Sequence, residues 1–355
     1  MSKVTVGLGC ELLKEDLDIL NQYCDIKQMP WTNHERAATL SEDEIIEAYK
    51  NCDIAYFYVE PVTRRVIEEL KANGLKLIGC GRGTPVNIDW QAAADNDLKI
   101  VYTPARNAHS VAEYTVGLLL ALAKRIPMTY HALKNKEYLA GPKDDPLNVE
   151  VQDDVIWLFR DGRPNPRSSF PKGIDVFGRT VGILGLGGIG QIVAKSLIGI
   201  GMNVIAYDPY QKDEVFEKLG VKRYDDMLKM LPECDFVSVH LAVTDETRGS
   251  LSDDFFNAMK KGTYFINTAR AAVIDQKALV NALNNGQVGF AAVDVMWEEP
   301  APENHPFFSM DNVIVTPHFA GVSSDVKKWS SVMARDEIMH FVNNEPNELV
   351  WKRLK

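Results

Sequence analysis

A glycine-rich loop between a strand-like segment and a helix-like segment constrains the fold more than any other feature of the sequence. The loop reads GLGGIG, with Gly185, Gly187 and Gly190 in a G-x-G-x-x-G pattern, and TVGIL precedes it. Here the first glycine permits a tight turn, the second lets a pyrophosphate approach the backbone, and the third lets the helix pack against the strand. The start of that helix offers free N–H groups to the phosphates. The loop therefore predicts a dinucleotide site, the alternative being a purely structural glycine-rich turn.

The next strand-like segment, NVIAYD, ends in an acid, Asp208. A carboxylate at this position accepts hydrogen bonds from the adenosine ribose and repels a 2′-phosphate. The residues that follow, PYQK, contain no arginine that would bind such a phosphate. The sequence therefore predicts NAD rather than NADP as the cofactor.

Short apolar runs alternate with helical segments along most of the chain. After residue 179 the runs are TVGILG, NVIAYD, FVSVHL, YFINTA, FAAVDV and VIVTPH. Before residue 105 they are VTVGLG, DIAYFYVE, KLIGCGRG and KIVYTP, with amphipathic segments at 12–23, 42–50 and 63–73. Such alternation is typical of βαβ units in a parallel sheet. Because 355 residues exceed an ordinary single domain, we expect an α/β protein with two doubly wound parallel-sheet domains.

Three other segments stand outside this alternation. Residues 108–126 predict a long helix that is apolar on nearly all sides, and so is buried or shared between domains or subunits. Residues 325–355 predict a final amphipathic helix and a short tail. Residues 140–173 are rich in Pro, Gly, Asp and Arg around the apolar island VIWLF. A connection of this length is usually functional or disordered, and we expect the island to dock on another surface.

Composition and charge exclude several classes of protein. The net charge is −10, and no cluster of five or more Lys and Arg residues occurs, so a nucleic-acid surface is not expected. No apolar run is long enough to span a bilayer, and residues 1–10 do not read as a signal peptide, which predicts a cytoplasmic protein. The five cysteines include no CxxC pair, so neither a metal site nor a disulfide framework is expected.

Polar side chains suited to acid–base chemistry follow three of the later strand-like segments. INTAR ends in Arg270, VDVMWEEP contains Asp294 and Glu299, and VTPH ends in His318. The carboxyl ends of parallel strands meet at one edge of the sheet, where ligands bind. A histidine accepts a hydroxyl proton near neutral pH, a carboxylate stabilises its protonated form, and an arginine binds a carboxylate. Together these residues predict hydride transfer from a 2-hydroxy acid to NAD, although each alone also fits a structural role.

The sequence resembles the D-isomer-specific 2-hydroxyacid dehydrogenase family, and in particular phosphoglycerate dehydrogenase-like members. The resemblance rests on LGLGGIG with YDP, FINTARAAVIDQKALVNALNNG, VDVMWEEP with HPFF, and VIVTPHFAG, and it covers nearly the whole chain. It implies that His318 is the acid/base, Glu299 its partner and Arg270 the substrate clamp. It also implies that Asp294 holds the nicotinamide carboxamide.

The same resemblance implies further binding residues and a domain organisation. The remaining cofactor contacts are Thr103, Gly188, Ile189, Leu241, Thr268, Ala269, Phe319, Ala320 and Gly321. The loop GCGRGTPVNID implies that Gly81, Arg82 and Gly83 bind the substrate carboxylate. A flavodoxin-like substrate domain would comprise residues 1–104 and 322–355, and a Rossmann NAD-binding domain residues 105–321. The helix at 109–126 resembles the family's dimer-forming helix, so a homodimer is expected.

Several departures from the family pattern leave alternatives open. Residues 140–173 are longer than the usual connection, and Arg160, Arg163 and Arg167 within them either add basic contacts to a substrate cleft or belong to a decoration of the dimer interface. A formate dehydrogenase of the same fold is one alternative, but the resemblance implies Gln in that group at the position where this chain has Glu299. An NAD(H)-sensing protein, like the corepressors of this superfamily, is the alternative from a different functional class.

Overall fold

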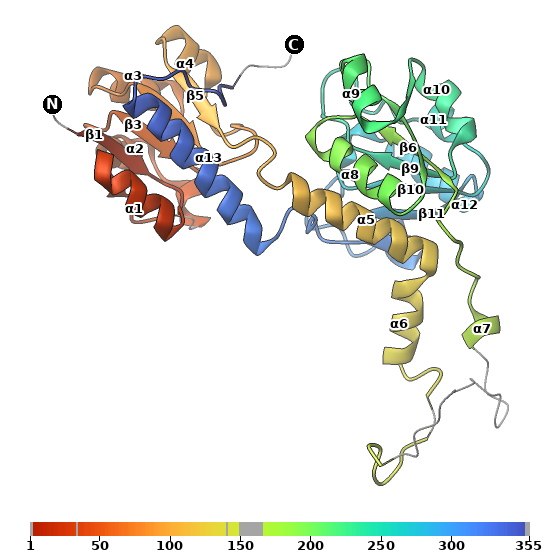
Figure 1. The fold of residues 1–355 in the computed structure, drawn as a ribbon. Coiled ribbons are helices and arrows are strands. Elements are labelled where there is room, and N and C mark those ends of the chain that lie inside the picture. Colours follow the sequence, from red (N-terminus) through yellow and green to blue (C-terminus); the bar gives the residue numbers. More distant parts are fainter. Residues whose placement is uncertain (1–2, 33–34, 140, 149–165, 352–355) are drawn as a thin grey trace. The chain divides into compact units, whose positions relative to one another are not determined.

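A computed structural model describes residues 3–32, 35–139, 141–148 and 166–351, and these divide into two compact units (Figure 1). Unit 1 consists of Met1–Ser110 and Gly321–Lys355, and unit 2 of Val111–Ala320. The boundaries expected from the sequence lie a few residues from these divisions. In the 140–173 segment, Arg160 and Arg163 and the VIWLF island lie outside the described residues.

Unit 1 contains a five-stranded parallel sheet in the order β2-β1-β3-β4-β5, the flavodoxin-like order. Its strands are β1 (Val4–Leu8), β2 (Cys24–Gln28), β3 (Ile54–Phe57), β4 (Leu77–Cys80) and β5 (Lys99–Tyr102). The sequence did not predict β2, because this edge strand reads CDIKQ and buries only Cys24. An edge strand needs no continuous apolar run, since one side of it pairs with nothing.

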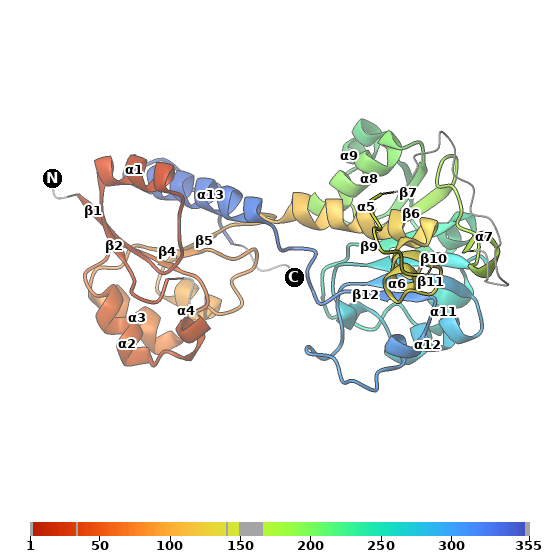
Figure 2. The ribbon, with the colours of Figure 1, turned by 90° about the horizontal axis from the view of Figure 1, so that it is seen from below.

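Helices cover both faces of this sheet (Figure 2). On one face lie α1 (Lys14–Tyr23) and α13 (Ser324–Val342), and on the other α2 (Glu42–Tyr49), α3 (Arg64–Ala72) and α4 (Trp90–Asp95). The buried Asp16 of α1 joins the two helices of the first face, because it accepts hydrogen bonds from Ser331 and Arg335 of α13. The chain then returns to β5, where Val350 forms an antiparallel bridge with Val101.

Unit 2 contains a seven-stranded parallel sheet in the order β12-β11-β10-β9-β6-β7-β8, the strand order of a Rossmann fold with one added edge strand. Its strands are β6 (Thr180–Leu184), β7 (Asn203–Tyr207), β8 (Lys222–Tyr224), β9 (Phe236–Val239), β10 (Thr263–Asn267), β11 (Val288–Val293) and β12 (Val313–Val315). The predicted fold class, two doubly wound parallel-sheet domains, is therefore confirmed. Only β8 was not predicted, because it is a short, charged edge strand.

Two apolar cores, one on each face of this sheet, hold unit 2 together. On one face pack α5 (Ala108–Lys124), α8 (Gly188–Gly199) and α9 (Asp213–Leu219). On the other pack α10 (Met227–Met230), α11 (Asp253–Asn257) and α12 (Gln276–Asn284). This arrangement leaves the carboxyl ends of the strands, with the loops that follow them, to form a binding edge.

The helix predicted at 108–126 is in fact broken, so its predicted end is wrong. α5 ends at Lys124, Arg125 adopts the left-handed conformation (φ +60°), and α6 (Ile126–Lys134) follows. Pro127 explains the break, because proline fits the first turn of a helix but disrupts its interior. Ile126, Tyr130 and Leu133 of α6 are exposed, and the homodimer stays a prediction. A short helix, α7 (Pro166–Ser169), precedes unit 2's first strand.

A buried arginine fixes this break. Arg125 is 6% exposed, and its guanidinium donates to the Leu122 carbonyl and the Tyr264 hydroxyl, both at 2.7 Å. The guanidinium carbon also lies 3.4 Å from the centre of the Phe290 ring. Among the described residues no carboxylate pairs with it, so two hydrogen bonds and an aromatic face stabilise the charge.

We expect Arg125→Lys to destabilise unit 2 by about 2 kcal/mol, because a lysine ammonium lacks the planar fork that reaches both oxygen acceptors. The measurement is the thermal unfolding midpoint of the purified variant. Arg179→Lys is the matched control, because the Arg179 side chain is 42% exposed, its ion pair with Asp235 is long at 3.7 Å, and it makes one hydrogen bond, to the Asp175 carbonyl, within the described residues. Equal midpoints for the two variants would contradict the role assigned to Arg125.

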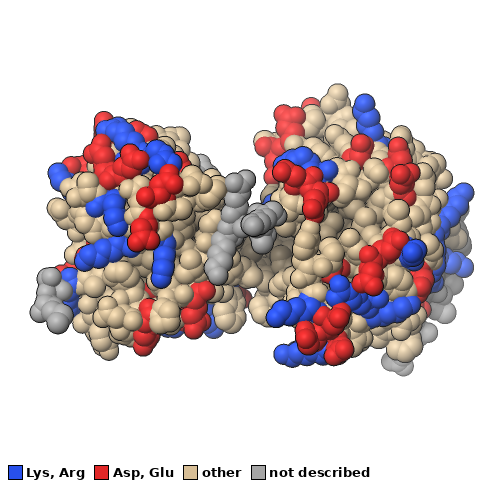
Figure 3. Space-filling view, turned by 90° about the horizontal axis from the view of Figure 1, so that it is seen from above, with Lys and Arg blue, Asp and Glu red and all other residues tan. Residues whose placement is uncertain are grey.

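The structure also shows the distribution of surface charge and the state of the cysteines. On the face drawn in Figure 3, acidic and basic side chains are interspersed over both units. None of the helices in the described ranges is long and apolar enough to cross a membrane. All five cysteines are buried and free. Within the described residues, no three His, Cys, Asp or Glu side chains gather in a way that could hold a metal ion.

Candidate active site

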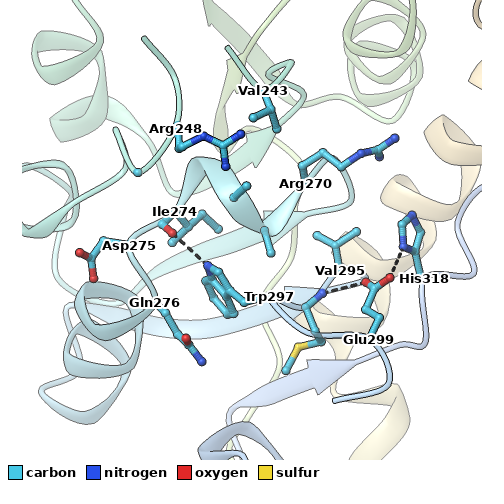
Figure 4. Close-up of a pocket in the computed structure, with 14 residues that line it drawn as sticks. Val243, Arg248, Arg270, Ile274, Asp275, Gln276, Val295, Trp297, Glu299 and His318 are labelled. Atoms are coloured by element: carbon cyan, nitrogen blue, oxygen red, sulfur yellow. Dashed lines mark hydrogen bonds and ion pairs between the residues drawn. The ribbon is translucent and has the colours of Figure 1, made fainter. Parts of the chain in front are cut away.

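The loops after three adjacent strands of unit 2 meet in one pocket of about 650 Å³ (Figure 4). Arg270 follows β10, Glu299 follows β11, and His318 follows β12. These strands are neighbours in the sheet, so their carboxyl ends bring the three side chains to the same edge. Figure 4 shows His318 and Glu299 side by side, with the Arg270 guanidinium on the same side of the pocket.

His318 and Glu299 form a direct pair. His318 Nδ1 lies 2.7 Å from Glu299 Oε2, and the Met296 N–H donates to Glu299 Oε1 at 3.0 Å. Partial burial alone would raise the pKa of Glu299, but these hydrogen bonds and the nearby charges of His318 and Arg270 hold it below its ordinary value. Glu299 is therefore a carboxylate, and it fixes the imidazole with Nδ1 engaged and Nε2 directed elsewhere.

The buried Asp294 builds the turn that presents His318. Its Oδ1 accepts the Thr316 hydroxyl (2.6 Å) and the Phe319 N–H (2.8 Å), and its Oδ2 accepts the Ala320 N–H (2.9 Å). Its own carbonyl accepts the His318 N–H at 2.8 Å. These bonds hold His318 in the left-handed conformation (φ +55°), which non-glycine residues adopt at a cost. Asp294 is thus a positioning residue for the acid/base candidate.

Arg270 is presented by a turn that Asn267 closes. The fully buried Asn267 side chain accepts the Ala269 N–H at 2.9 Å and donates to the Arg270 carbonyl at 3.0 Å. Arg270 uses one Nη1 donor on the Ala269 carbonyl, at 2.7 Å. The other N–H groups of this guanidinium face the pocket or solvent. They leave it able to bind a carboxylate bidentately, through two parallel hydrogen bonds.

Two other histidines of unit 2 have different environments. His240 lies 2.9 Å from the Ser238 hydroxyl, and desolvation by burial lowers its pKa to about 4. Burial likewise lowers the pKa of His305, whose Nδ1 accepts the Phe307 N–H. Both rings therefore stay neutral near pH 7, and neither has a carboxylate partner within the described residues. Of these three histidines, His318 has the partner that an acid/base catalyst needs.

The glycine loop has the shape that a pyrophosphate requires. Gly185 has φ +90°, and a Cβ there would lie 2.7 Å from the His240 carbonyl oxygen. At Gly190 a Cβ would lie 2.1 Å from the Gly185 carbonyl oxygen, so only glycine allows α8 to begin so close to β6. Nothing lies within 4 Å of a Cβ placed on Gly187, and no side chain caps α8. The second glycine therefore opens onto space where phosphate oxygens would meet the helix N-terminus.

Asp208 is tied to this loop. Its Oδ2 accepts the Leu186 N–H at 2.8 Å, and its Oδ1 accepts the N–H groups of Tyr210 and Gln211. A carboxylate has about four acceptor positions, so one remains for a ribose hydroxyl. The residues present fit a dinucleotide at this edge of the sheet.

The comparisons with known proteins agree with this geometry. Residues 116–320 match the model of the D-isomer specific 2-hydroxyacid dehydrogenase, NAD binding domain. The chain belongs to this family. It is 36% identical over 317 residues to a D-3-phosphoglycerate dehydrogenase of Methanocaldococcus jannaschii, covering 89% of this chain and 55% of that protein. It is 30% identical over 312 residues to a glyoxylate reductase of Korarchaeum cryptofilum, covering 87% and 86% respectively.

A solved structure supports the same fold. The holo form of Rhodotorula graminis D-mandelate dehydrogenase superposes with a TM-score of 0.80 at 21% identity, covering 100% of this chain and 99% of that one. The chain spans about half the length of the phosphoglycerate dehydrogenase that it matches. The family match covers the NAD-binding domain, so the cofactor class is a nicotinamide dinucleotide, in accord with the glycine loop.

The other cofactor contacts implied by the family are placed as follows in unit 2. The Thr268 hydroxyl is buried and lies 2.7 Å from the Thr115 hydroxyl of α5, so its side chain joins α5 to the end of β10. The Ala269 N–H is already bonded to Asn267. The Phe319 and Ala320 N–H groups are bonded to Asp294, whereas the Phe319 ring is exposed. Leu241 lies directly after His240, beside Gly185.

Gly188 and Ile189 are the first two residues of α8. The other five predicted residues belong to unit 1 and are Gly81, Arg82, Gly83, Thr103 and Gly321. The Arg82 carbonyl accepts the Thr103 N–H at 3.2 Å, so the predicted substrate loop lies against the end of β5. The Thr103 hydroxyl is buried and has no hydrogen-bond partner in the described structure. Such an orphan hydroxyl fits a position that contacts a ligand.

Sequence reasoning missed three residues of the pocket, Arg248, Gln276 and Trp297. Arg248 lies in the loop after the strand that ends in VSVH. A cation after a strand end is the same signal that indicated Arg270. Trp297 lies inside the VDVMWEEP motif, in which the acids Asp294 and Glu299 were the residues predicted to act. Gln276 contacts His305 Nε2 at 2.8 Å, a pairing of residues distant in sequence that no local pattern indicates.

Proposed function

We propose that the protein is an NAD-dependent oxidoreductase that interconverts a 2-hydroxy acid, of the D configuration, and its 2-oxo acid. The observation that carries this proposal is the His318–Glu299 pair, 2.7 Å apart, beside Arg270 at the carboxyl edge of a Rossmann sheet. An acid/base pair next to a guanidinium with donors left for a ligand is what a reacting C–OH group with an adjacent carboxylate requires.

His318 transfers the proton. A carboxylate acceptor at Nδ1 favours the tautomer with hydrogen on that nitrogen, so Nε2 faces the substrate oxygen. In reduction, protonated His318 donates the Nε2 proton to the carbonyl oxygen of the 2-oxo acid. In oxidation, neutral His318 accepts the hydroxyl proton at the same nitrogen. Glu299 stabilises the imidazolium in both directions and keeps its own charge.

Arg270 orients the substrate. Its fork binds the substrate carboxylate and polarises the adjacent C–O bond, so the reacting carbon is held near His318. The nicotinamide, when bound, supplies or accepts the hydride at substrate C2. We infer that Asp294, which holds the His318 turn, also binds the carboxamide end of the cofactor, and that Asp208 favours NAD by its charge.

The relatives set the range of substrates to test. Their names include phosphoglycerate and glyoxylate enzymes. We expect NADH oxidation, followed at 340 nm, with at least one acid from a panel of glyoxylate, hydroxypyruvate, 3-phosphohydroxypyruvate and longer 2-oxo acids. NADPH in place of NADH serves as the cofactor control. Tight NADH binding without turnover on any acid would favour the NAD(H)-sensing alternative.

A further inference from the structure

The pocket continues beyond the catalytic residues to a second arginine. Arg248 lines it from the loop after β9, and Trp297 lines it on the side of Ile274 and Gln276 (Figure 4). Asp275 and Gln276 line the end away from His318. All of these residues lie in unit 2. The pocket therefore has a catalytic end and a distal end, with a cation at each.

The loop that carries Arg248 is held in place. The Thr247 hydroxyl donates to the Ala242 carbonyl at 2.6 Å and accepts the Thr244 N–H at 2.8 Å. The Arg248 N–H donates to the Thr244 carbonyl, and the Gly249 N–H to the Ala272 carbonyl at 2.9 Å. These hydrogen bonds hold the backbone before and after Arg248. The base of the Arg248 side chain therefore has a fixed position at the pocket.

The acidic side chains that line the pocket are engaged elsewhere and do not pair with Arg248. Glu299 is committed to His318 and the Met296 N–H, and Asp275 Oδ1 caps α12 by accepting the Ala278 N–H at 3.0 Å. Within the described part of the chain, the Arg248 guanidinium has no carboxylate or hydrogen-bond partner. A guanidinium with five unused donors binds a carboxylate bidentately. The distal end therefore offers a site for an anionic group.

Part of the pocket wall is apolar (Figure 4). Val243, Ile274 and Val295 line it together with Trp297. The Trp297 indole is fixed, because its Nε1–H donates to the Ile274 carbonyl at 3.1 Å and its ring stacks on His305. A short methylene chain would contact these side chains without leaving a polar group unpaired.

We propose that the distal end is a specificity site and that the favoured substrates are 2-oxo dicarboxylic acids. Arg270 binds the carboxylate next to the reacting carbon, the methylene groups lie along Trp297, and Arg248 binds the second carboxylate. This proposal rests on the proposed function, because it assigns the reacting end to Arg270 and His318.

The test compares 2-oxoadipate with 2-oxohexanoate, and 2-oxoglutarate with 2-oxopentanoate, pairs of equal carbon count that differ in the terminal carboxylate. Wild type is expected to favour the dicarboxylate by more than about tenfold in kcat/KM for at least one pair. Arg248→Gln is expected to lower that ratio about 10- to 100-fold, mainly by raising KM for the dicarboxylate. Arg248→Lys should retain part of the preference, because it keeps the charge but loses the fork.

Lys261→Gln is the control for net charge, since Lys261 precedes β10 and so lies at the opposite edge of the sheet. An equal ratio in wild type and Arg248→Gln would overturn the specificity site. The same acids are titrated calorimetrically into the protein with NADH present. Binding that depends on Arg248 without any turnover would overturn the proposed function and keep the site, and binding that ignores Arg248 would overturn the site.

Discussion

Replacing His318 with alanine is expected to lower kcat about 10²- to 10⁴-fold, the usual contribution of a positioned general acid or base. NADH affinity should stay within about twofold, because the glycine loop and Asp208 are untouched. The measurement is steady-state NADH oxidation with the best acid of the panel, alongside a fluorescence titration with NADH. His131→Ala is the matched control, since His131 is an exposed residue of α6 whose Nε2 lies 2.8 Å from the Asn135 side-chain nitrogen.

The pH dependence gives a second readout for the same pair. Reduction requires protonated His318, so kcat/KM for reduction should fall as pH rises, whereas oxidation should rise over the same range. Glu299→Gln removes the charge that stabilises the imidazolium, so the pH at which reduction is half-maximal should move lower. Full activity of His318→Ala, or the same pH profile in both directions, would contradict the assignment of His318.

The sequence predicted the parts of the protein that local patterns determine. Gly185, Gly187 and Gly190 are identifiable because strand, turn and helix follow one another within a few residues, and each glycine answers a local steric demand. Arg270 and His318 are identifiable because a polar residue at the end of an apolar run projects at the binding edge of a parallel sheet. Strand alternation also gave the fold class, which the structure confirms.

Features that depend on contacts between distant segments were not predictable. The burial of the Arg125 side chain at the helix break depends on Tyr264 and Phe290, which lie far along the chain and supply the environment for a buried cation. The edge strands β2 and β8 form because a neighbouring strand offers its hydrogen bonds, although their own sequences are charged. Local propensity does not contain that information, because tertiary pairing overrides it.

The site shows the same division. The contact of Asp294 with the nicotinamide stays a prediction. What the structure shows is that Asp294 accepts hydrogen bonds from Thr316, Phe319 and Ala320. An acid in a motif can be noticed from sequence, but the donors it satisfies belong to the fold. The sequence does not show that Arg248 and Trp297 line the same pocket, because they come from different loops.

Asp294→Asn is expected to destabilise unit 2 by about 3 kcal/mol and to lower kcat about 10²-fold. Asparagine has one acceptor oxygen and a donor NH₂ group, so it cannot accept three hydrogen bonds on two atoms. At least one of the Phe319 and Ala320 N–H groups, or the Thr316 hydroxyl, then loses its acceptor inside the protein. The turn that holds His318 in the left-handed conformation loosens, and proton transfer suffers with it.

Three measurements distinguish this positioning role from a contact with the cofactor alone. The urea midpoint of Asp294→Asn should fall, and amide hydrogen exchange should accelerate at Phe319 and Ala320, both without cofactor. Asp311→Asn makes the same chemical change at an exposed carboxylate and should move neither. If Asp294→Asn weakened NADH binding but left the midpoint and the exchange rates unchanged, Asp294 would act through the nicotinamide. The turn at His318 would then hold without it, because the backbone bonds of residues 316–320 would suffice.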